Sequence, residues 1–157
     1  MKATFDYSTA LVPSHAKLIA SGLPTTVSMR AYVFQDRTSF PVALTIKTCR
    51  IVYDVWDEYY RLSISQSGAA SMEARAPNLE GVLRRCGRVT DFGLVDRGML
   101  QPGVSYYVAV VVDVDPTTMW QHRLDRWIAN PTGPMIPFDA TTNGISRMTF
   151  RTASFLP

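Results

Sequence analysis

The stretch PVALTIKTCRIVYDVWDEYYRLSIS, residues 41–65, contains two extended segments on either side of a short polar turn. β-Branched and aliphatic residues occupy both alternating sets of positions over residues 41–53, which is typical of a strand covered on both faces. Residues 58–65 alternate more regularly, with an apolar side made of Tyr60, Leu62 and Ile64. Residues 54–57 remain for the turn, although they lack the Asn-Gly or Asp-Gly pair of the tightest hairpins. We therefore expect a long β-hairpin from about Pro41 to Ser65, and a fold built on it.

Further strand patterns lie on both sides of this hairpin. Residues 25–35 carry apolar side chains at alternate positions of one face, namely Val27, Met29, Ala31 and Val33. Residues 104–114 are almost continuously apolar, which predicts a strand in the centre of a sheet. Residues 3–11 and 145–151 predict a first and a last strand.

Two or three short helices are expected between these strands. Ser14 is a candidate N-cap for a first helix, which Gly22 would end. Asn78 is the candidate N-cap of a second helix that ends at Gly87, with an apolar stripe of Leu79, Val82, Leu83 and Cys86. Residues 117–128 are the third candidate.

The remaining segments are predicted to be connections. Residues 66–77 are mostly small and polar, and residues 130–144 contain three prolines and an Asn-Gly pair. Phe92, Leu94 and Val95 are expected to be packing residues within a connection. Since no linker divides the chain, we expect a single domain over residues 1–157.

A short motif before the apolar strand points to a particular β architecture. Leu100, a Pro-Gly turn and then Tyr106 entering a strand have the pattern of a tyrosine corner, in which the tyrosine hydroxyl bonds a nearby backbone group. Tyrosine corners are typical of immunoglobulin-like sandwiches. The predicted fold is therefore mainly β (α+β), an immunoglobulin-like antiparallel β-sandwich with two or three short helices.

The charge distribution and the hydropathy exclude two classes of protein. The formal net charge is +3, and the 13 Arg and 3 Lys are scattered, the nearest approach to a cluster being Arg84, Arg85 and Arg88. Nucleic-acid binders gather their basic residues into a patch or stripe. No apolar run approaches the roughly 18 residues of a membrane-spanning helix. We expect neither a nucleic-acid partner nor an integral membrane segment.

The two cysteines, Cys49 and Cys86, are too far apart in sequence for a metal-binding motif. They are either two buried thiols that act as small apolar side chains or a disulfide between a strand and a helix. A disulfide would imply an oxidising compartment. A catalytic thiol is the least favoured interpretation, because neither cysteine has a neighbouring base.

The sequence contains no recognisable catalytic motif. The G-x-S-x-G, G-x-G-x-x-G and P-loop patterns are all missing. Four residues could ligate a divalent cation: Asp113, Asp115, His122 and Asp125. The alternative is that the two strand acids end a strand and the other two lie on a solvated helix face. We expect no catalytic residue, metal, cofactor or small-molecule substrate, and a metal-dependent enzyme using these four residues is the less favoured alternative.

The tip of the predicted hairpin is the candidate partner-binding site, formed by Tyr53, Trp56, Asp57 and Tyr59. Aromatic residues of this kind carry much of the binding energy of protein interfaces. The alternative is that the rings stabilise the hairpin by pairing across its strands. Trp56 fits that alternative least, because it lies at the tip.

Several motifs occur in an order that resembles a known family. They are the helix end over residues 18–24, Tyr53 followed by Tyr60-Arg61-Leu62-Ser63, the helix pattern Leu-x-x-Val-Leu over residues 79–83, and Leu-x-Pro-Gly-x-x-Tyr before the valine-rich strand. Over about residues 14–116 this order is similar to the domain of unknown function 4390, an uncharacterised family of secreted or lipid-anchored bacterial proteins. The chain departs from that family in the turn at residues 55–57 and after Pro116. The resemblance implies only a cell-envelope setting, because the family has no established catalytic residues.

Together these observations predict a non-enzymatic interaction or structural module of the bacterial cell envelope. Its partner would be another protein or a second copy of the chain, bound through the hairpin tip. We expect it in the periplasm or envelope after removal of a signal peptide, with the cytoplasm as the alternative. A subunit of a larger assembly, such as a filament, shell or secretion apparatus, is the alternative function.

Overall fold

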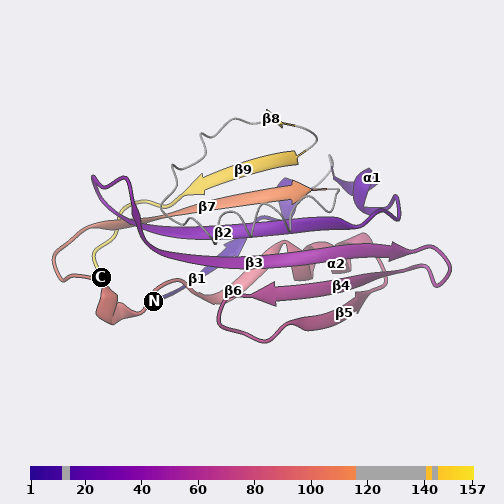
Figure 1. Ribbon diagram of the computed structural model, residues 1–157, viewed down its shortest axis with the longest axis horizontal. Coiled ribbons are helices and arrows are strands. Elements are labelled where there is room, and N and C mark those ends of the chain that lie inside the picture. Colours follow the sequence, from indigo (N-terminus) through magenta and orange to yellow (C-terminus); the bar gives the residue numbers. More distant parts are fainter. Residues whose placement is uncertain (12–14, 116–140, 143–144) are drawn as a thin grey trace.

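The computed structural model describes residues 1–11, 15–115, 141–142 and 145–157 (Figure 1). Antiparallel sheets dominate this part of the chain, and short helices connect them, as the mainly-β prediction requires. The predicted helix at residues 117–128 and most of the predicted loop at residues 130–144 lie outside the described residues.

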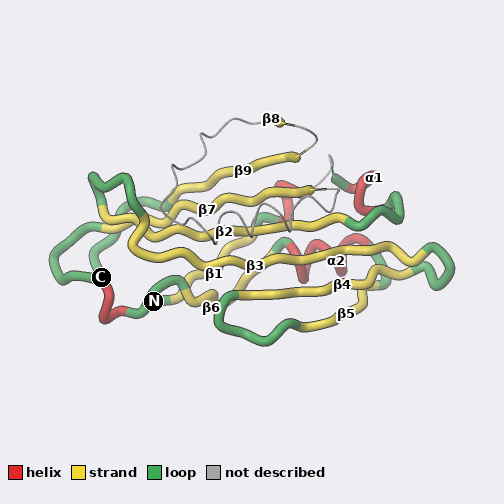
Figure 2. The backbone as a smooth tube through the Cα atoms, viewed as in Figure 1, coloured by secondary structure: helices red, strands yellow, loops and turns green. Residues whose placement is uncertain are grey.

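Within the described residues, the larger sheet has seven antiparallel strands in the order β5-β4-β3-β2-β7-β9-β8 (Figure 1, Figure 2). Four strands that follow one another in the chain lie side by side, and β7 then returns to the free side of the first of them. The strands are β2 (Thr25–Gln35), β3 (Pro41–Asp54), β4 (Tyr59–Gln66), β5 (Met72–Ala76), β7 (Tyr106–Asp115), β8 (Thr141–Thr142) and β9 (Ile145–Arg151).

A second layer covers one face of this sheet. It contains a two-stranded antiparallel sheet and short helical segments, and its elements are β1 (Lys2–Asp6), β6 (Arg88–Gly93), α1 (Ala16–Ile19), α2 (Leu79–Cys86) and the 3-10 turns η1 (Ser8–Leu11) and η2 (Arg97–Met99). We call the covered face of the larger sheet its inner face. The two layers are consistent with a β-sandwich, while the immunoglobulin-like assignment stays a prediction.

The core lies between the two layers. The large sheet contributes apolar side chains from alternate positions of its central strands, including Val27, Met29, Ala31 and Val33 of β2, Ile51 of β3, Leu62 of β4 and Val110, Val112 and Val114 of β7. Val82 of α2 and Phe92 of β6 meet them from the other layer, and both are fully buried. Alternation of side chains along each strand thus sorts the sequence into a core face and an opposite outer face.

The predicted hairpin is confirmed as β3 and β4. Tyr53 pairs with Tyr60 and Lys47 with Gln66, so the two strands stay in register without a shift. Glu58 adopts a left-handed backbone conformation, with φ of 52°, at the end of the turn. An exposed turn tolerates that conformation in a non-glycine residue more readily than a strand does.

The tyrosine-corner hydrogen bond is present. The Tyr106 hydroxyl accepts a hydrogen bond from the backbone amide of Gln101 at 3.0 Å, and the ring is 1% exposed. Gly103 takes the left-handed conformation that the preceding turn requires, with φ of 76°. The short motif therefore predicted this local structure, whichever wider family of sandwiches the fold belongs to.

Three local predictions were wrong. Residues 66–77 were expected to be a loop, but they contain β5, whose small and charged residues suit a sheet edge. Phe92, Leu94 and Val95 are buried, as expected of packing residues, but Phe92 belongs to β6 rather than to a connection. The first strand, expected over residues 3–11, ends at Asp6, and residues 8–11 form the 3-10 turn η1 instead.

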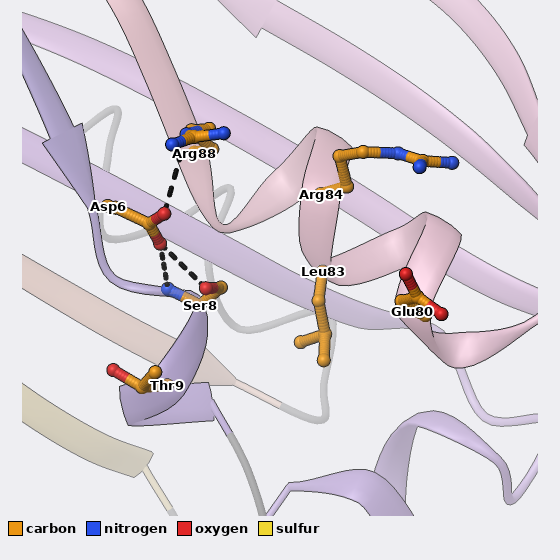
Figure 3. A pocket seen from close by; sticks show the side chains of 7 residues that line it. All are labelled: Asp6, Ser8, Thr9, Glu80, Leu83, Arg84 and Arg88. Carbon is orange, nitrogen blue, oxygen red and sulfur yellow. Dashed lines mark hydrogen bonds and ion pairs between the residues drawn. The ribbon is translucent and has the colours of Figure 1, made fainter.

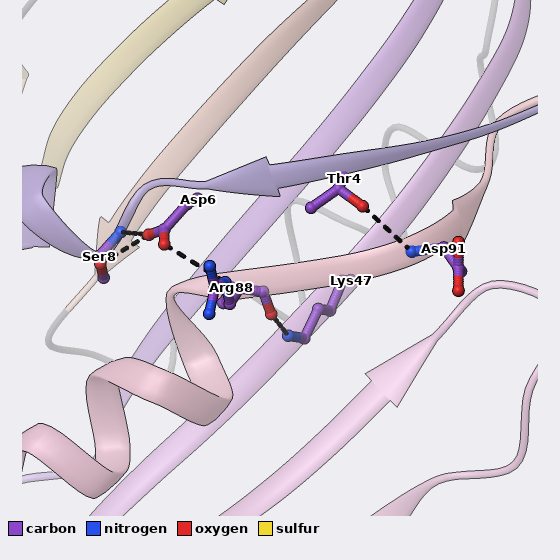
Figure 4. A network of polar contacts seen from close by, with 6 residues as sticks. All are labelled: Thr4, Asp6, Ser8, Lys47, Arg88 and Asp91. Carbon is purple, nitrogen blue, oxygen red and sulfur yellow. Dashed lines mark hydrogen bonds and ion pairs between the residues drawn. The ribbon is translucent and has the colours of Figure 1, made fainter.

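Lys47 attaches the long strand β3 to the end of α2. Its buried ammonium group donates hydrogen bonds to the carbonyl oxygens of Arg85 at 2.8 Å and Arg88 at 2.7 Å. Figure 4 shows Arg88 between Lys47 and Asp6, whose carboxylate lies 3.4 Å from the Arg88 guanidinium. The last carbonyl groups of a helix lack partners within the helix, and a cation there is favourable. Lys47 therefore caps α2 through the Arg85 carbonyl and also holds the start of β6 through the Arg88 carbonyl.

Tyr7 satisfies the neighbouring carbonyl groups. Its hydroxyl donates to the carbonyl of Cys86 at 2.6 Å, and its backbone amide donates to the carbonyl of Gly87 at 2.8 Å. A Cβ atom on Gly87 would lie 2.8 Å from the Cα of Ser8, which is closer than side chains approach. Gly87 thus permits the close contact between η1 and α2 that brings Tyr7 into place.

A disulfide bond joins Cys49 of β3 to Cys86 of α2. Their Cα atoms are 5.5 Å apart, within the usual range for disulfides, and both residues are buried. Of the two alternatives that the sequence left open, the structure contains the disulfide. Lys47 and Cys49 lie two residues apart on the inner face of β3, so the covalent bond and the lysine cap hold the same end of α2.

Replacing both cysteines should destabilise the protein measurably. The bond closes a segment with a sequence separation of 37 residues. For a loop of that size, chain entropy predicts that the Cys49→Ala, Cys86→Ala double variant loses about 3–4 kcal/mol of unfolding free energy. Denaturant unfolding of both proteins measures the difference. Two reactive thiols in the denatured, unreduced wild type would contradict the bond itself.

The stability of the protein should also depend on the protonation of Lys47. Burial lowers the pKa of Lys47 to about 8, from 10.5. Between these values the unfolded chain holds a proton that the folded chain has released, so the free energy of unfolding rises with pH in this window. The slope from one proton is at most about 1.4 kcal/mol per pH unit.

Denaturant unfolding at several pH values between 7 and 10 tests this expectation, with Lys47→Met as the variant and Lys2→Met as the control. Lys2 is exposed, so Lys2→Met controls for the removal of one positive charge from the chain. Parallel profiles for wild type and Lys47→Met would show that Lys47 does not titrate in this range.

Candidate functional site

The candidate site is the turn that joins β3 to β4. Trp56 is 91% exposed and Val55 is 60% exposed, although both are large apolar residues. Asp57 and Glu58 are exposed beside them. The sequence placed Trp56 at an exposed tip, and the structure agrees. A tryptophan that is almost fully in water contributes little to the core, so Trp56 is a candidate surface contact residue.

Asp54 fixes the shape of this turn. One of its carboxylate oxygens accepts hydrogen bonds from the amides of Trp56 at 3.1 Å and Asp57 at 3.2 Å. The other oxygen pairs with the Arg61 guanidinium at 2.5 Å. The hydrogen bond from the Asp57 amide is the main influence that holds the pKa of Asp54 below its usual value, with the Trp56 amide and Arg61 adding to it. Trp56 is thus presented on an ordered turn.

The two predicted tyrosines lie on opposite faces of the sheet. Tyr53 is on the inner face, where its ring packs against Tyr60 with centroids 4.7 Å apart. Tyr59 is on the outer face, where the guanidinium groups of Arg61 and Arg75 lie 5.6 Å and 4.8 Å from its ring centroid. Tyr53 therefore supports the hairpin from within, as the cross-strand alternative foresaw, while Tyr59 lies partly exposed below the tip.

The sequence did not predict that a second loop meets the tip. A Cβ atom built on Gly22 would lie 3.7 Å from Cγ1 of Val55, so the turn between α1 and β2 touches the hairpin tip. Leu23, the next residue, is 58% exposed. We call Leu23, Val55 and Trp56 the tip patch. An apolar residue between Gly22 and Pro24 was a local hint, but the contact of this turn with Val55 depends on the tertiary structure.

The tip patch offers contact area rather than reactive groups. Its three side chains are apolar, and the acidic residues Asp57 and Glu58 border it. Apolar centres with charged rims are the usual composition of protein interfaces. In composition the tip patch therefore resembles the centre of such an interface.

The four predicted metal ligands do not form a described site. Asp113 is 1% exposed and forms an ion pair with Arg30 of the neighbouring strand. The side chain of Asp115, and all of His122 and Asp125, lie outside the described residues. In the part of the chain that the structure describes, no three His, Cys, Asp or Glu residues are grouped so that they could hold a metal ion. A buried carboxylate paired with a guanidinium is an ordinary structural arrangement.

A shallow surface pocket of about 340 Å³ lies between η1 and α2 (Figure 3). Its lining residues are Asp6, Ser8, Thr9, Glu80, Leu83, Arg84 and Arg88. The Asp6 carboxylate already accepts hydrogen bonds from the amide and the hydroxyl of Ser8 and pairs with Arg88. Two guanidinium groups beside two carboxylates leave no excess of either charge. The pocket therefore has no clear preference for an anion or a cation.

Comparisons with family models, curated proteins and solved structures find no match for this chain, so its function is inferred from its own residues. Among the described helices, none has the length and apolar character needed to cross a membrane.

Removing the Asp54 carboxylate should loosen the tip. In Asp54→Ala the amides of Trp56 and Asp57 lose their acceptor, so they should exchange hydrogen for deuterium several-fold faster than in wild type. Hydrogen-exchange mass spectrometry of the peptide that spans the turn measures this. Asp57→Ala is the control, because no amide of the turn donates to its side chain among the described contacts. Equal exchange in wild type and Asp54→Ala would mean that the turn is ordered by other contacts.

Proposed function

We propose that this chain is a non-enzymatic interaction module that binds a protein partner through the tip patch of the β3–β4 hairpin. The single observation that carries the proposal is Trp56, which is 91% exposed at the end of a hairpin held in the core. Tryptophan is among the residues that contribute most to binding energy at interfaces. Val55 next to it is also exposed, as is Leu23 in the turn whose Gly22 lies close to Val55.

The ordered turn supports the same proposal. A binding residue on a rigid loop loses less conformational entropy when a partner is bound than one on a mobile loop. Asp54 holds the turn through two backbone amides and Arg61, and the packed rings of Tyr53 and Tyr60 support the strand ends below it. We therefore expect the tip to be preorganised, with the same turn conformation in the free and the bound protein.

The chemistry of the tip favours binding over catalysis. The tip patch has no nucleophile and no base, and the acids at its border are exposed and therefore hydrated. A general acid or base at a catalytic site usually lies in a cleft that shifts its pKa. Asp57 and Glu58 stand at the end of a protruding hairpin instead.

The disulfide between Cys49 and Cys86 supports an oxidising compartment. For a bacterial protein that compartment would be the periplasm or another part of the cell envelope, as the resemblance also implies. The proposal therefore includes an envelope location, with the cytoplasm as the alternative. An immunoglobulin-like sandwich, whose loops commonly carry binding sites, would be compatible with this role.

Replacing Trp56 should separate binding from stability. Trp56→Ala should leave the melting temperature within about 2 °C, since the removed side chain lies in water. Binding of a partner isolated from a bacterial envelope extract with the wild-type protein should weaken at least tenfold, as for a central interface tryptophan. Calorimetry of the isolated partner with wild type and variant measures the ratio.

Phe40→Ala is the matched control. Phe40 is also a large exposed aromatic, at 70%, but it lies in the turn between β2 and β3, at the other end of β3. Its replacement should not alter binding. Unchanged affinity in Trp56→Ala would refute the tip as the binding site, and a large loss of stability would show that Trp56 is a core residue.

A further inference from the structure

β5 forms one lateral edge of the larger sheet. Among the described residues it pairs with β4 alone, from Tyr60 opposite Ala76 to Ile64 opposite Met72. Met72, Glu73 and Arg75 are exposed. An edge strand carries backbone N–H and C=O groups to which a further strand can add.

The backbone of Glu73 and Arg75 faces this open edge. The Arg75 carbonyl accepts a hydrogen bond at 2.9 Å from the guanidinium of Arg85, which reaches it from α2, so this carbonyl is accessible at the edge. In an antiparallel strand the N–H and C=O of one residue point to the same side, and residues two apart repeat the direction. Glu73 therefore presents its backbone groups to the same edge as Arg75. Arg85 is itself exposed, so a pairing strand can displace its side chain.

The sequence of β5 is complementary in charge to itself. Met72-Glu73-Ala74-Arg75-Ala76 has its acidic and basic residues at equal distances from Ala74. If two β5 strands pair antiparallel about Ala74, Glu73 of each copy lies opposite Arg75 of the other. Directly opposed residues of antiparallel strands project to the same face, where opposite charges are favourable. Any one-residue shift of the register would lose both pairs.

On the outer face beside β5, Arg61 pairs with Asp54, whereas Arg75 has no ion pair among the described residues. Arg61 of β4 lies directly opposite Arg75, and both guanidinium groups lie against the ring of Tyr59. Like charges that face each other across two strands are unfavourable. Glu73 is occupied in accepting a hydrogen bond from Ser63 at 2.9 Å, yet its exposed carboxylate can accept more. The Glu73 of a second copy would bring a negative charge to the side of Arg75 away from Arg61.

We propose that two copies of this chain associate through β5, in a two-fold antiparallel arrangement that joins their seven-stranded sheets into one continuous sheet. Such an isologous contact uses the same surface on both copies. The exposed Met72 of each copy would then lie opposite Ala76 of the other, on the inner face next to its α2.

This pairing leaves the tip patch free. Ala76 pairs with Tyr60, so the Ala76 end of β5 is the end nearest the hairpin tip. Antiparallel pairing of two β5 strands therefore directs the two tips toward opposite ends of the joined sheet. The dimer would be a bivalent form of the proposed binding module, but it depends on a different surface and does not rest on the proposed function.

Sedimentation of the full chain tests the proposal. Concentrations from about 10 µM to 1 mM suit the weak association expected of a small interface. Wild type should show a monomer–dimer equilibrium in this range. Glu73→Arg and Arg75→Glu should each weaken dimerisation at least tenfold, because each places two pairs of like charges opposite each other. The double variant Glu73→Arg, Arg75→Glu restores both opposite-charge pairs and should recover wild-type dimerisation within about threefold, since the charges are exchanged rather than removed.

Glu80→Arg makes the same change of charge on an exposed position of α2 and should dimerise like wild type. Circular dichroism checks that every variant is folded. Recovery of dimerisation in the double variant would show that the single variants act through charge and not through loss of stability. A monomeric wild type at the highest concentration would overturn the proposal. So would dimerisation that the single charge reversals leave unchanged, or dimerisation that Trp56→Ala abolishes, because the last result would assign self-association to the tip patch.

Discussion

The attachment of β3 to the C-terminal end of α2 is the contact on which the two layers depend. A helix of eight residues has little stability of its own, and its last carbonyl groups would be left without partners in a dry interior. Lys47 and Tyr7 supply these partners from two other elements, and the disulfide from Cys49 fixes the same helix end covalently. Burying the Lys47 ammonium group costs desolvation free energy. Its hydrogen bonds to the carbonyl oxygens offset that cost, so the contact between the layers depends on these bonds.

β3 connects this attachment to the exposed hairpin turn. β3 is a long interior strand of the larger sheet, between β2 and β4. One part of it is held against α2, while its last residues and the first of β4 carry the turn outward. The same strand is therefore buried along its middle and leads into an exposed turn at its end. A rigid base and an exposed tryptophan are the combination that protein-binding loops commonly show, because loops on rigid scaffolds keep their shape at little entropic cost.

The two surfaces discussed for binding differ in chemistry. The tip patch is apolar with acidic neighbours, so burial of Trp56, Val55 and Leu23 would provide its affinity. The β5 edge is polar, so backbone hydrogen bonds and the pairing of Glu73 with Arg75 would provide register rather than strength. Arg85 at that edge resembles the charged residues that limit unwanted strand addition. A weak and register-specific self-association is what such an edge permits.

The sequence by itself determined the elements whose signals are local. The hairpin from Pro41, the strand at residues 25–35, the helix from Asn78 to Gly87 and the hydrogen bond of Tyr106 all follow from alternation, caps and a short turn motif. It also placed Trp56 at an exposed tip. Only the tertiary structure decided that residues 72–76 form an edge strand, since a short polar segment becomes a strand when a neighbour offers hydrogen bonds. It likewise decided that Cys49 meets Cys86, that Lys47 caps α2, and that the turn at Gly22 meets Val55. Each of these contacts joins residues far apart in the chain, so their proximity depends on how the elements pack.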